Sequence, residues 1–495
     1  MRKFTRRGLL VGAGGAAGWV GARKLSSRLP ISQGAGYTGV DPADGFLNDA
    51  SGLSQTPIFR HITMGQDPGD RLIAAIRGEI TEAATAGRPV NIGAARHSMG
   101  AQAIPRDGHA ITFENGFVET NTAGRSYLCH AGARWSQVIA ALDPIGFSPA
   151  VMQSNNDFGV AATFCVNAHG WPVPFGPMGA TVQSFRMVLP TGDLATCSRR
   201  ENAEIFNLTM GGYGLTGAII DMVVDMVPNQ RLQPTFLTLA ASEFAPGFMA
   251  AVADPAVTMA YGRLNVDRAR LFEDALLVTY RPTGDQSDLP AAQGSGLMSR
   301  MASYVYRWQL GNEPMKRLRW WTETALAPAL GDGPATRNSL INEPVVTLDD
   351  RDPTRTDILH EYFVAPDRFD DFLIACREVV PASYQEFLNV TLRYIAQDDE
   401  SVLSYAPTPR IAAVMSFSQE MTSRGEADMA NMTRALIDRI TEIGGSYYLP
   451  YRPHATVDQM IRSYPRASEF AAAKRALDPN LTFRNNLWDS YLEAL

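Results

Sequence analysis

The sequence predicts an α+β protein with two domains, and two observations lead to this prediction. Helical and strand patterns are mixed along residues 55–234, where short strand-like runs separate apolar helical stretches. At about residue 235 the chain changes character, and longer strand-like and helix-like runs begin to alternate. Apolar residues spaced for both helices and strands indicate helices packed on sheets.

The first domain begins with a helical pattern over 72–86, whose apolar residues fall near one face. A short strand is expected at 89–92. The remaining runs predict strands at 110–113 and 127–131, a helix at 135–142, a hairpin of 185–189 with 194–197, and an apolar strand over 218–227. Glycine and aspartate in the turn between 189 and 194 suit a tight hairpin.

The second domain, residues 235–447, contains both kinds of pattern. Strand-like runs lie at 275–280, 360–364 and 411–417, and helix-like runs at 368–379 and 427–443. Residues 30–54 are rich in Gly, Pro, Ser and Asp, which predicts an extended lead-in. We expect residues 448–495 to return to the first domain.

Composition excludes several classes of function. The chain has 495 residues, of which 45% are hydrophobic and 19% charged, as in a globular protein. Its net charge is −7, and removing the seven basic groups of the first 28 residues leaves −14. Such an acidic body is a poor candidate for nucleic-acid binding. The four cysteines form no C-x-x-C pair, so we expect no structural zinc site.

Residues 1–29 are expected to be a targeting segment. The run Thr5-Arg6-Arg7-Gly8-Leu9-Leu10 resembles a twin-arginine signal, and the weakly apolar stretch 11–22 after it is too short and Gly-rich for a convincing membrane span. This resemblance implies export of the folded protein to the periplasm by the twin-arginine export machinery. No clear A-x-A cleavage site follows, which leaves an uncleaved membrane anchor open.

The loop Gly93-Ala94-Ala95-Arg96-His97-Ser98-Met99-Gly100-Ala101-Gln102 is the most informative motif of the chain. It follows the strand predicted at 89–92, and small side chains let backbone N–H groups approach a diphosphate closely. His97 lies in the middle, where it could bond a flavin ring. Strand, loop and histidine together favour a flavin diphosphate site, although the segment alone also fits an ordinary surface loop.

Two further blocks make the interpretation specific. Asn167-Ala168-His169-Gly170 is followed by Gly176 and Gly179, and later comes Met210-Gly211-Gly212-Tyr213-Gly214-Leu215-Thr216-Gly217-Ala218-Ile219. With the first loop, in this order and spacing, they resemble the FAD-binding domain of vanillyl-alcohol-oxidase-type flavoproteins over most of 55–230. The resemblance implies a two-part FAD-binding domain, an α+β substrate (cap) domain, and FAD as cofactor.

The resemblance also implies which residues hold FAD. They lie in the first loop, in the segments around 154–162 and 169–170, at Ile219 near the adenine end, and at Tyr448. The full set is Gly93, Ala94, Ala95, Arg96, His97, Ser98, Gln102, Ser154, Gly159, Val160, Ala161, Ala162, His169, Gly170, Ile219 and Tyr448.

Two histidines have further roles implied by the resemblance. His97 stands where alditol, lactone and cytokinin oxidases carry a histidine that often bonds the flavin 8α carbon, so Arg96-His97-Ser98 resembles the covalent type. The alternative is a His97 that only packs or hydrogen-bonds near the ring. His169 is expected either at the flavin or substrate, or as a satisfied core histidine.

Motifs of the second domain are similar to those of two groups of enzymes. Tyr362-Phe363-Val364-Ala365-Pro366, Glu386-Phe387-Leu388-Asn389-Val390 and Tyr464-Pro465-Arg466 resemble decaprenylphosphoryl-ribose oxidases. Arg452-Pro453-His454 and the run 478–483 look like sugar-lactone and alditol oxidases. The chain departs from both groups, because Ala455 and Val457 replace the Trp and Lys of the lactone type and Tyr451 replaces a lysine of the ribose oxidases.

The resemblance implies an FAD-dependent oxidoreductase that oxidises a CH–OH group of a sugar, polyol or lactone-like substrate by hydride transfer to flavin. Such a reaction needs a base for the hydroxyl proton. The expected catalytic residues are Arg452, His454, Tyr451 and Asn389, with Tyr362 as a further substrate contact. Oxygen, a quinone and a carrier protein all remain open as electron acceptor.

Two alternatives belong to other classes. A flavin-binding protein without turnover, with a partner or assembly role, is suggested by the missing lysine. A metal-dependent hydrolase would use His97, His130 and His169, but no two of them have metal-ligand spacing, so no metal site is expected.

Overall fold

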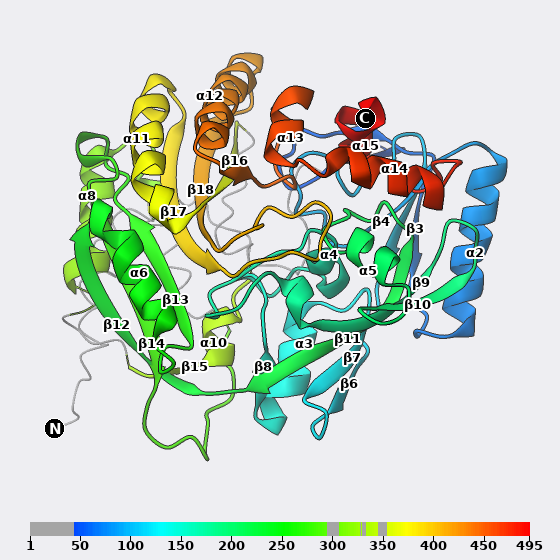
Figure 1. Ribbon diagram of the computed structural model, residues 1–495, viewed down its shortest axis with the longest axis horizontal. Helices are drawn as coiled ribbons and strands as arrows, with labels where there is room; N and C mark the ends of the chain where they lie inside the picture. Colours follow the sequence, from blue (N-terminus) through cyan, green and yellow to red (C-terminus); the bar gives the residue numbers. More distant parts are fainter. Residues whose placement is uncertain (1–43, 295–305, 327, 329–332, 345–353) are drawn as a thin grey trace.

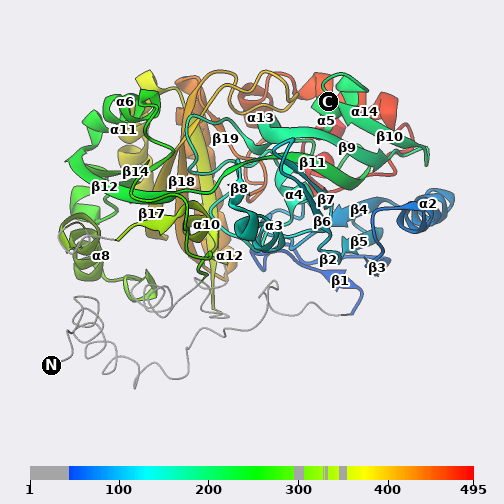
Figure 2. The same ribbon diagram turned by 90° about the horizontal axis from the view of Figure 1, so that it is seen from below.

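A computed structural model describes residues 44–294, 306–326, 328, 333–344 and 354–495. The segment expected to be a twin-arginine signal, residues 1–29, and most of the expected lead-in lie outside the described residues. The described chain contains both helices and sheets throughout, which confirms the predicted α+β class. Helix α2 (Asp70–Thr85) and helix α8 (Glu313–Trp321) lie at opposite ends of the molecule in both views (Figures 1 and 2).

A small parallel sheet opens the first half of the fold. Its order is β3 (Arg60–Met64), β5 (His109–Phe113), β4 (Val90–Gly93), and α2 connects β3 to β4. Helix α2 buries Leu72, Ile73, Ile76, Ile80 and Ala83, which are the apolar stripe seen in the sequence. The predicted helix and strand are therefore confirmed, and the loop at 93–102 begins where β4 ends.

A six-stranded antiparallel sheet completes this half. Its strands are β10 (Leu194–Ser198), β9 (Val182–Val188), β11 (Ala218–Pro228), β7 (Ser126–His130) and β6 (Val118–Asn121), with β8 (Phe147–Pro149) paired to β11. Helices α3 (Trp135–Leu142), α4 (Val160–Cys165) and α5 (Ala203–Thr209) lie between these strands in the sequence. The predicted hairpin is confirmed as β9 and β10, and Gly192 in its turn has φ +86°, which favours glycine.

The second half is an eight-stranded antiparallel sheet. In order, its strands are β15 (Ala335–Thr336), β12 (Arg231–Ala240), β14 (Asp274–Pro282), β13 (Met259–Leu264), β17 (Glu386–Ile395), β18 (Arg410–Glu420), β16 (Arg355–Val364) and β19 (Ser446–Tyr447). Helices α6 (Phe244–Ala253), α11 (Phe369–Val379) and α12 (Ser423–Glu442) cover one face (Figure 1).

Alternation along these strands decides which side chains meet the helices. In β16, Ile358, His360, Tyr362 and Val364 are buried in or beside the core, and His360 Nε2 lies 3.1 Å from Thr433 Oγ1 of α12. Leu359 and Glu361 therefore point to the opposite face, because successive side chains of a strand alternate. That opposite face looks toward the first half of the molecule.

The C-terminal residues lie against the first half of the fold. Helices α13 (Val457–Ser463), α14 (Ala467–Leu477) and α15 (Asn486–Ser490) follow β19 (Figure 1). Between α14 and α15, Phe483 forms a parallel bridge with Val90 of β4, whose N–H donates to the Thr482 carbonyl at 2.6 Å. The Asn485 amide donates to the carbonyls of Gln102 and Tyr213. The tail thus fixes both ends of the loop that begins at Gly93.

Among the helices of the described ranges, none is both long enough and apolar enough to cross a membrane.

Candidate functional site

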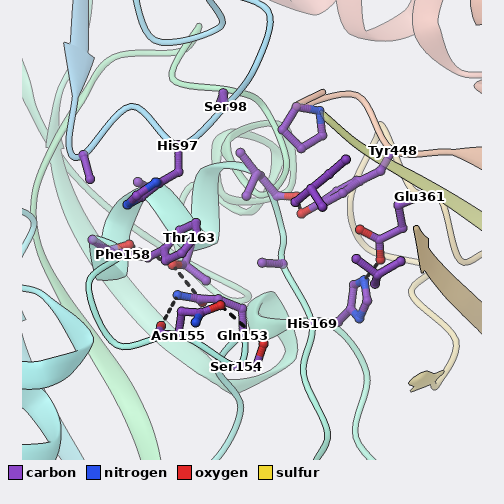
Figure 3. Close-up of a pocket in the computed structure, with 18 of the residues that line it drawn as sticks. His97, Ser98, Gln153, Ser154, Asn155, Phe158, Thr163, His169, Glu361 and Tyr448 are labelled. Atoms are coloured by element: carbon purple, nitrogen blue, oxygen red, sulfur yellow. Dashed lines mark hydrogen bonds and ion pairs between the residues drawn. The ribbon is translucent and has the colours of Figure 1, made fainter. Parts of the chain in front are cut away.

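A cavity of about 980 Å³ lies between the two halves of the molecule. One wall comes from the loop after β4 and from residues 153–169, and the other from the uncovered face of the eight-stranded sheet. Figure 3 shows His97 and Phe158 on one side and Glu361, His169 and Tyr448 on the other. A mostly apolar cavity between two structural units is a typical place for a cofactor.

Fourteen of the sixteen residues predicted to hold FAD line this cavity. They are Gly93, Ala94, Ala95, Arg96, His97, Ser98, Gln102, Ser154, Gly159, Ala161, Ala162, His169, Ile219 and Tyr448. Val160 does not, because it is fully buried in the hydrophobic core. Gly170 does not either, since it packs against the Met152 backbone, where an added Cβ would lie 1.9 Å from the carbonyl oxygen.

Small residues in this wall are required by close packing. A Cβ added to Gly159 would lie 2.8 Å from the Ala94 Cβ, and one added to Gly93 would lie 2.9 Å from the Arg96 guanidinium. The backbone of Arg96 has φ +51°, a conformation that residues other than glycine rarely adopt. The loop is therefore fixed in an unusual shape, with its backbone open to the cavity.

The Arg96 side chain is the best test of whether the cavity fits FAD. Its Nε and Nη2 atoms are buried and have no hydrogen-bond partner within the described part of the chain. Burial, together with repulsion from Arg134, lowers the pKa of Arg96 to about 10. A buried cation without a counter-charge is costly, and the two negative charges of a diphosphate would supply one.

His97 lies in a largely apolar place. Its ring stacks on Phe158 with centroids 4.2 Å apart, and its Nε2 lies 3.6 Å from Asp157 Oδ2. The His97 side chain is 13% exposed. Burial lowers the pKa of His97, while the Asp157 carboxylate opposes the shift. His97 is therefore neutral near pH 7, with one ring nitrogen facing a carboxylate.

The opposite wall carries a buried carboxylate that sequence reasoning missed. Glu361 contacts His169 Nε2 through Oε1, and its Oε2 accepts a hydrogen bond from the Tyr451 hydroxyl at 3.1 Å. The Glu361 and His169 side chains are 2% and 3% exposed. Burial lowers the pKa of His169, although Glu361 opposes this. A neutral His169 then donates from Nε2 to the carboxylate.

The structure brings two of the four predicted catalytic residues to the cavity. Asn389 and Tyr451 line it. Arg452 and His454 do not, because both bind Glu426 of α12, at 2.5 Å and 2.8 Å from its Oε1. Both donors lower the pKa of Glu426. This cluster holds α12 to the segment after β19, and Arg452 and His454 are therefore not placed to contact a substrate in the cavity.

Tyr362, expected as a substrate contact, does not line the cavity. Tyr362 is 1% exposed and faces α12 and the core, whereas its neighbour Glu361 faces the cavity.

The three histidines suggested for a metal-dependent hydrolase do not form a cluster. His169 binds Glu361, and His130 Nδ1 accepts a hydrogen bond from the Gly132 N–H. Within the described ranges, no group of three His, Cys, Asp or Glu side chains could hold a metal ion.

Comparisons with known proteins agree with an FAD site in this cavity. Residues 73–198 match the family model of the FAD binding domain. Cytokinin dehydrogenase 7 of Oryza sativa subsp. japonica is 27% identical over 141 residues, 28% of this chain and 27% of the relative. The mitochondrial L-galactono-1,4-lactone dehydrogenase of Arabidopsis thaliana is 23% identical over 146 residues, 29% and 23% of the two chains.

A third relative is an uncharacterized oxidoreductase of Rhodococcoides fascians, 33% identical over 95 residues, which is 19% of this chain and 22% of the relative. The matches thus span about a quarter of each relative's length. The matched region includes the loop at 93–102, residues 153–169 and α4. Residues 73–198 are therefore an FAD binding domain similar to that of FAD-linked oxidoreductases, and the cofactor is FAD.

Proposed function

We propose that this protein oxidises a CH–OH group of a sugar, polyol or lactone-like substrate, and that FAD bound in the cavity accepts the hydride. The observation that carries the proposal is the buried Glu361 carboxylate in the wall opposite His97, held by His169 and Tyr451. The names of two relatives add support, since one is named a lactone dehydrogenase and the other a "putative D-arabinono-1,4-lactone oxidase".

The chain provides residues for each part of the cofactor. The loop 93–98 offers backbone N–H groups and the unpaired Arg96 cation to the diphosphate. Ile219, which the resemblance assigns to the adenine end, also lines the cavity. Tyr448, whose hydroxyl donates to the Val166 carbonyl at 2.7 Å, forms part of the wall between His169 and the loop.

Glu361 is the proton acceptor in this proposal. The substrate hydroxyl gives its proton to the carboxylate, which requires Glu361 to be ionised before the reaction. His169 and Tyr451 keep the carboxylate in place by donating to its two oxygens. Each oxygen of a carboxylate can accept a second hydrogen bond, so both donors leave room for the substrate. Asn389 on β17 provides a further polar contact.

Two further parts of the proposal concern attachment and location. We assign His97 as the attachment point of a covalent flavin, because its neutral ring lies in the cavity wall beside Phe158. We also assign the twin-arginine-like segment to export into the periplasm. Replacing both Arg6 and Arg7 by Lys should leave the flavin-loaded protein in the cytoplasm, whereas unchanged export would contradict this assignment.

The test uses the purified flavin-loaded protein under anaerobic conditions. It is mixed with a panel of sugars, sugar acids, polyols and lactones, and the visible flavin absorbance is followed. Bleaching by at least one member of the panel is the expected result. If dithionite bleaches the flavin and no panel member does, the protein is better described as a flavin-binding protein without turnover.

A further inference from the structure

Two arginines share the cavity face of the eight-stranded sheet. Arg263 of β13 is in register with Thr391 of β17, and Arg393 lies two residues further along β17. Residues two apart on a strand point to the same face, and both guanidinium groups line the cavity. The two positive charges are therefore neighbours on one wall.

Neutral groups hold these two arginines. Arg263 Nη1 donates to Thr391 Oγ1 at 2.8 Å, and its guanidinium lies 5.5 Å from the centre of the Tyr261 ring. Arg393 donates to the His169 carbonyl and to Ser154 Oγ, both at 3.1 Å. Neither forms an ion pair with a carboxylate of the described residues. Burial lowers the pKa of Arg393, and Arg263 adds to this shift while the Glu361 carboxylate opposes it.

The acids on this side of the cavity already have partners of their own. Glu323 binds Arg319 Nε at 2.7 Å, and Glu361 is held by His169 and Tyr451. Their charges act on the two arginines at longer range, Glu361 on Arg393 and Glu323 on Arg263, without forming an ion pair among the described residues. A half-buried arginine beside a cavity, without a paired carboxylate, is suited to bind an anion that enters from outside.

The surroundings of the two arginines are rich in neutral polar groups. Asn389, Thr391 and Ser416 all line the same wall. The Trp171 ring also lines the cavity and stacks on Tyr261, with centroids 4.6 Å apart. Hydroxyl and amide groups beside an aromatic ring suit a compact ligand that carries several hydroxyls.

We propose that the substrate is a polyhydroxylated anion, a sugar that bears a carboxylate or a phosphate, and that Arg263 and Arg393 bind its acidic group. This inference rests on the proposed function, because it describes the molecule oxidised at that site. Guanidinium groups bind both carboxylate and phosphate in a bidentate manner, so the two sources share one recognition chemistry. The acidic group would fix the sugar on the sheet, with its CH–OH groups toward Glu361.

The experiment compares matched compounds on the flavin-loaded protein. Glucose, gluconate and glucose 6-phosphate are each used as substrate, with other neutral, carboxylate and phosphate sugars in the same three classes. Gluconate and phosphate ions are also titrated alone, and the perturbation of the flavin spectrum reports their binding. We expect kcat/KM for one anionic class to exceed that of the neutral class by at least about 10-fold.

Three variants distinguish the loss of the Arg263 charge from a general effect on folding. Arg263→Gln should weaken anion binding and lower kcat/KM for the anionic class by about 10- to 100-fold, mainly through KM. Arg263→Lys keeps the charge and should recover part of the loss. Arg270→Gln, at a side chain that is 57% exposed and outside the cavity, is the matched control and should change nothing.

The outcomes also separate this inference from the proposed function. Neutral sugars that reduce the flavin as well as anionic ones, with no effect of Arg263→Gln, overturn the anion subsite and leave the oxidation intact. Anions that perturb the flavin spectrum and lose this effect in Arg263→Gln support the subsite even if no compound reduces the flavin. Unperturbed spectra with both anions, and no reduction by anionic sugars, also overturn it.

Discussion

Glu361 and His169 meet in a buried contact that joins the two halves of the molecule. Glu361 belongs to β16 of the eight-stranded sheet, and His169 follows α4 in the first half. The same carboxylate also accepts a hydrogen bond from the Tyr451 hydroxyl, and all three residues line the cavity. A polar network in such a place both aligns the two halves and supplies a group that can take a proton.

Glu361→Gln keeps the size of the side chain and removes its ability to accept a proton. We expect kcat for flavin reduction to fall by about 10²- to 10⁴-fold, because this is the usual contribution of a positioned base. The visible flavin spectrum should remain. Glu442→Gln, at an exposed position, is the control. Single-turnover reduction of the bound flavin measures the effect, and a wild-type rate in Glu361→Gln would assign the proton to another group.

Arg96→Met removes the unpaired cation of the loop and keeps an apolar stem. FAD should bind about 10- to 100-fold more weakly, because a charge-assisted contact to the diphosphate is lost. All proteins also carry His97→Ala, which removes the proposed covalent bond, so that apoprotein can be prepared and titrated with FAD while flavin fluorescence reports binding. Arg200→Met, at an exposed residue, is the control. Equal affinity in all three proteins would place the diphosphate away from Arg96.

His97→Ala tests the covalent bond. After acid precipitation, the yellow colour of the wild-type protein should stay in the pellet, and that of His97→Ala should pass to the supernatant. His61→Ala, at a histidine that contacts Thr112 and does not line the cavity, is the control and should behave as the wild type. Colour released from the wild-type protein would show that FAD is held without a covalent bond.

His360 should make stability depend on pH. Burial lowers the pKa of His360 to about 3, whereas the unfolded chain has a value near 6.5. Below pH 6.5 the unfolded state takes up a proton that the folded state does not, so stability is full above 6.5 and falls toward pH 3. The slope is about 1.4 kcal/mol per pH unit. Denaturant unfolding from pH 7 to 4 should show this contribution. In His360→Gln, the free energy of unfolding should depend on pH less steeply, by about 1.4 kcal/mol per pH unit, which is the contribution of one proton.

Asp478 should be important for the attachment of the C-terminal residues. It binds Lys474, and its oxygens accept the N–H groups of Thr482 and Phe483 at 2.9 Å and 2.8 Å. Asp478→Asn leaves the buried Lys474 charge without its partner, so we expect a loss of about 3–5 kcal/mol. Thermal and denaturant unfolding measure it. Asp458→Asn, at a side chain that is 79% exposed, should cost little.

Local patterns were sufficient for much of the fold and for one wall of the cavity. Helix α2, the hairpin of β9 and β10, and the run that forms β11 were each visible in a few consecutive residues. The loop at 93–98 was equally visible, because a diphosphate requires small side chains in a continuous segment. The resemblance then located fourteen cavity residues among sixteen named.

The polar wall was harder to predict, because alternation along a strand has two phases and the sequence does not say which one faces the cavity. Tyr362 was expected where Glu361 lies, an error of one residue that turns a side chain to the opposite face. The signal for the correct phase was weak, because apolar residues occupy both sets of alternate positions in β16. Positions 358, 362 and 364 are apolar in one set, and 359 and 363 in the other.

The sequence by itself determined the class of the fold, the cofactor loop and the histidine within it, because these depend on residues that are close together in the chain. The tertiary structure decided the remainder. Arg452 and His454 lie at Glu426 because α12 passes beside them, and Glu361 meets His169 across 192 positions of sequence. Burial then lowers the pKa of His169, and within the described residues Arg96, Arg263 and Arg393 form no ion pair with a carboxylate. Such contacts join distant segments through packing, and no local pattern records them.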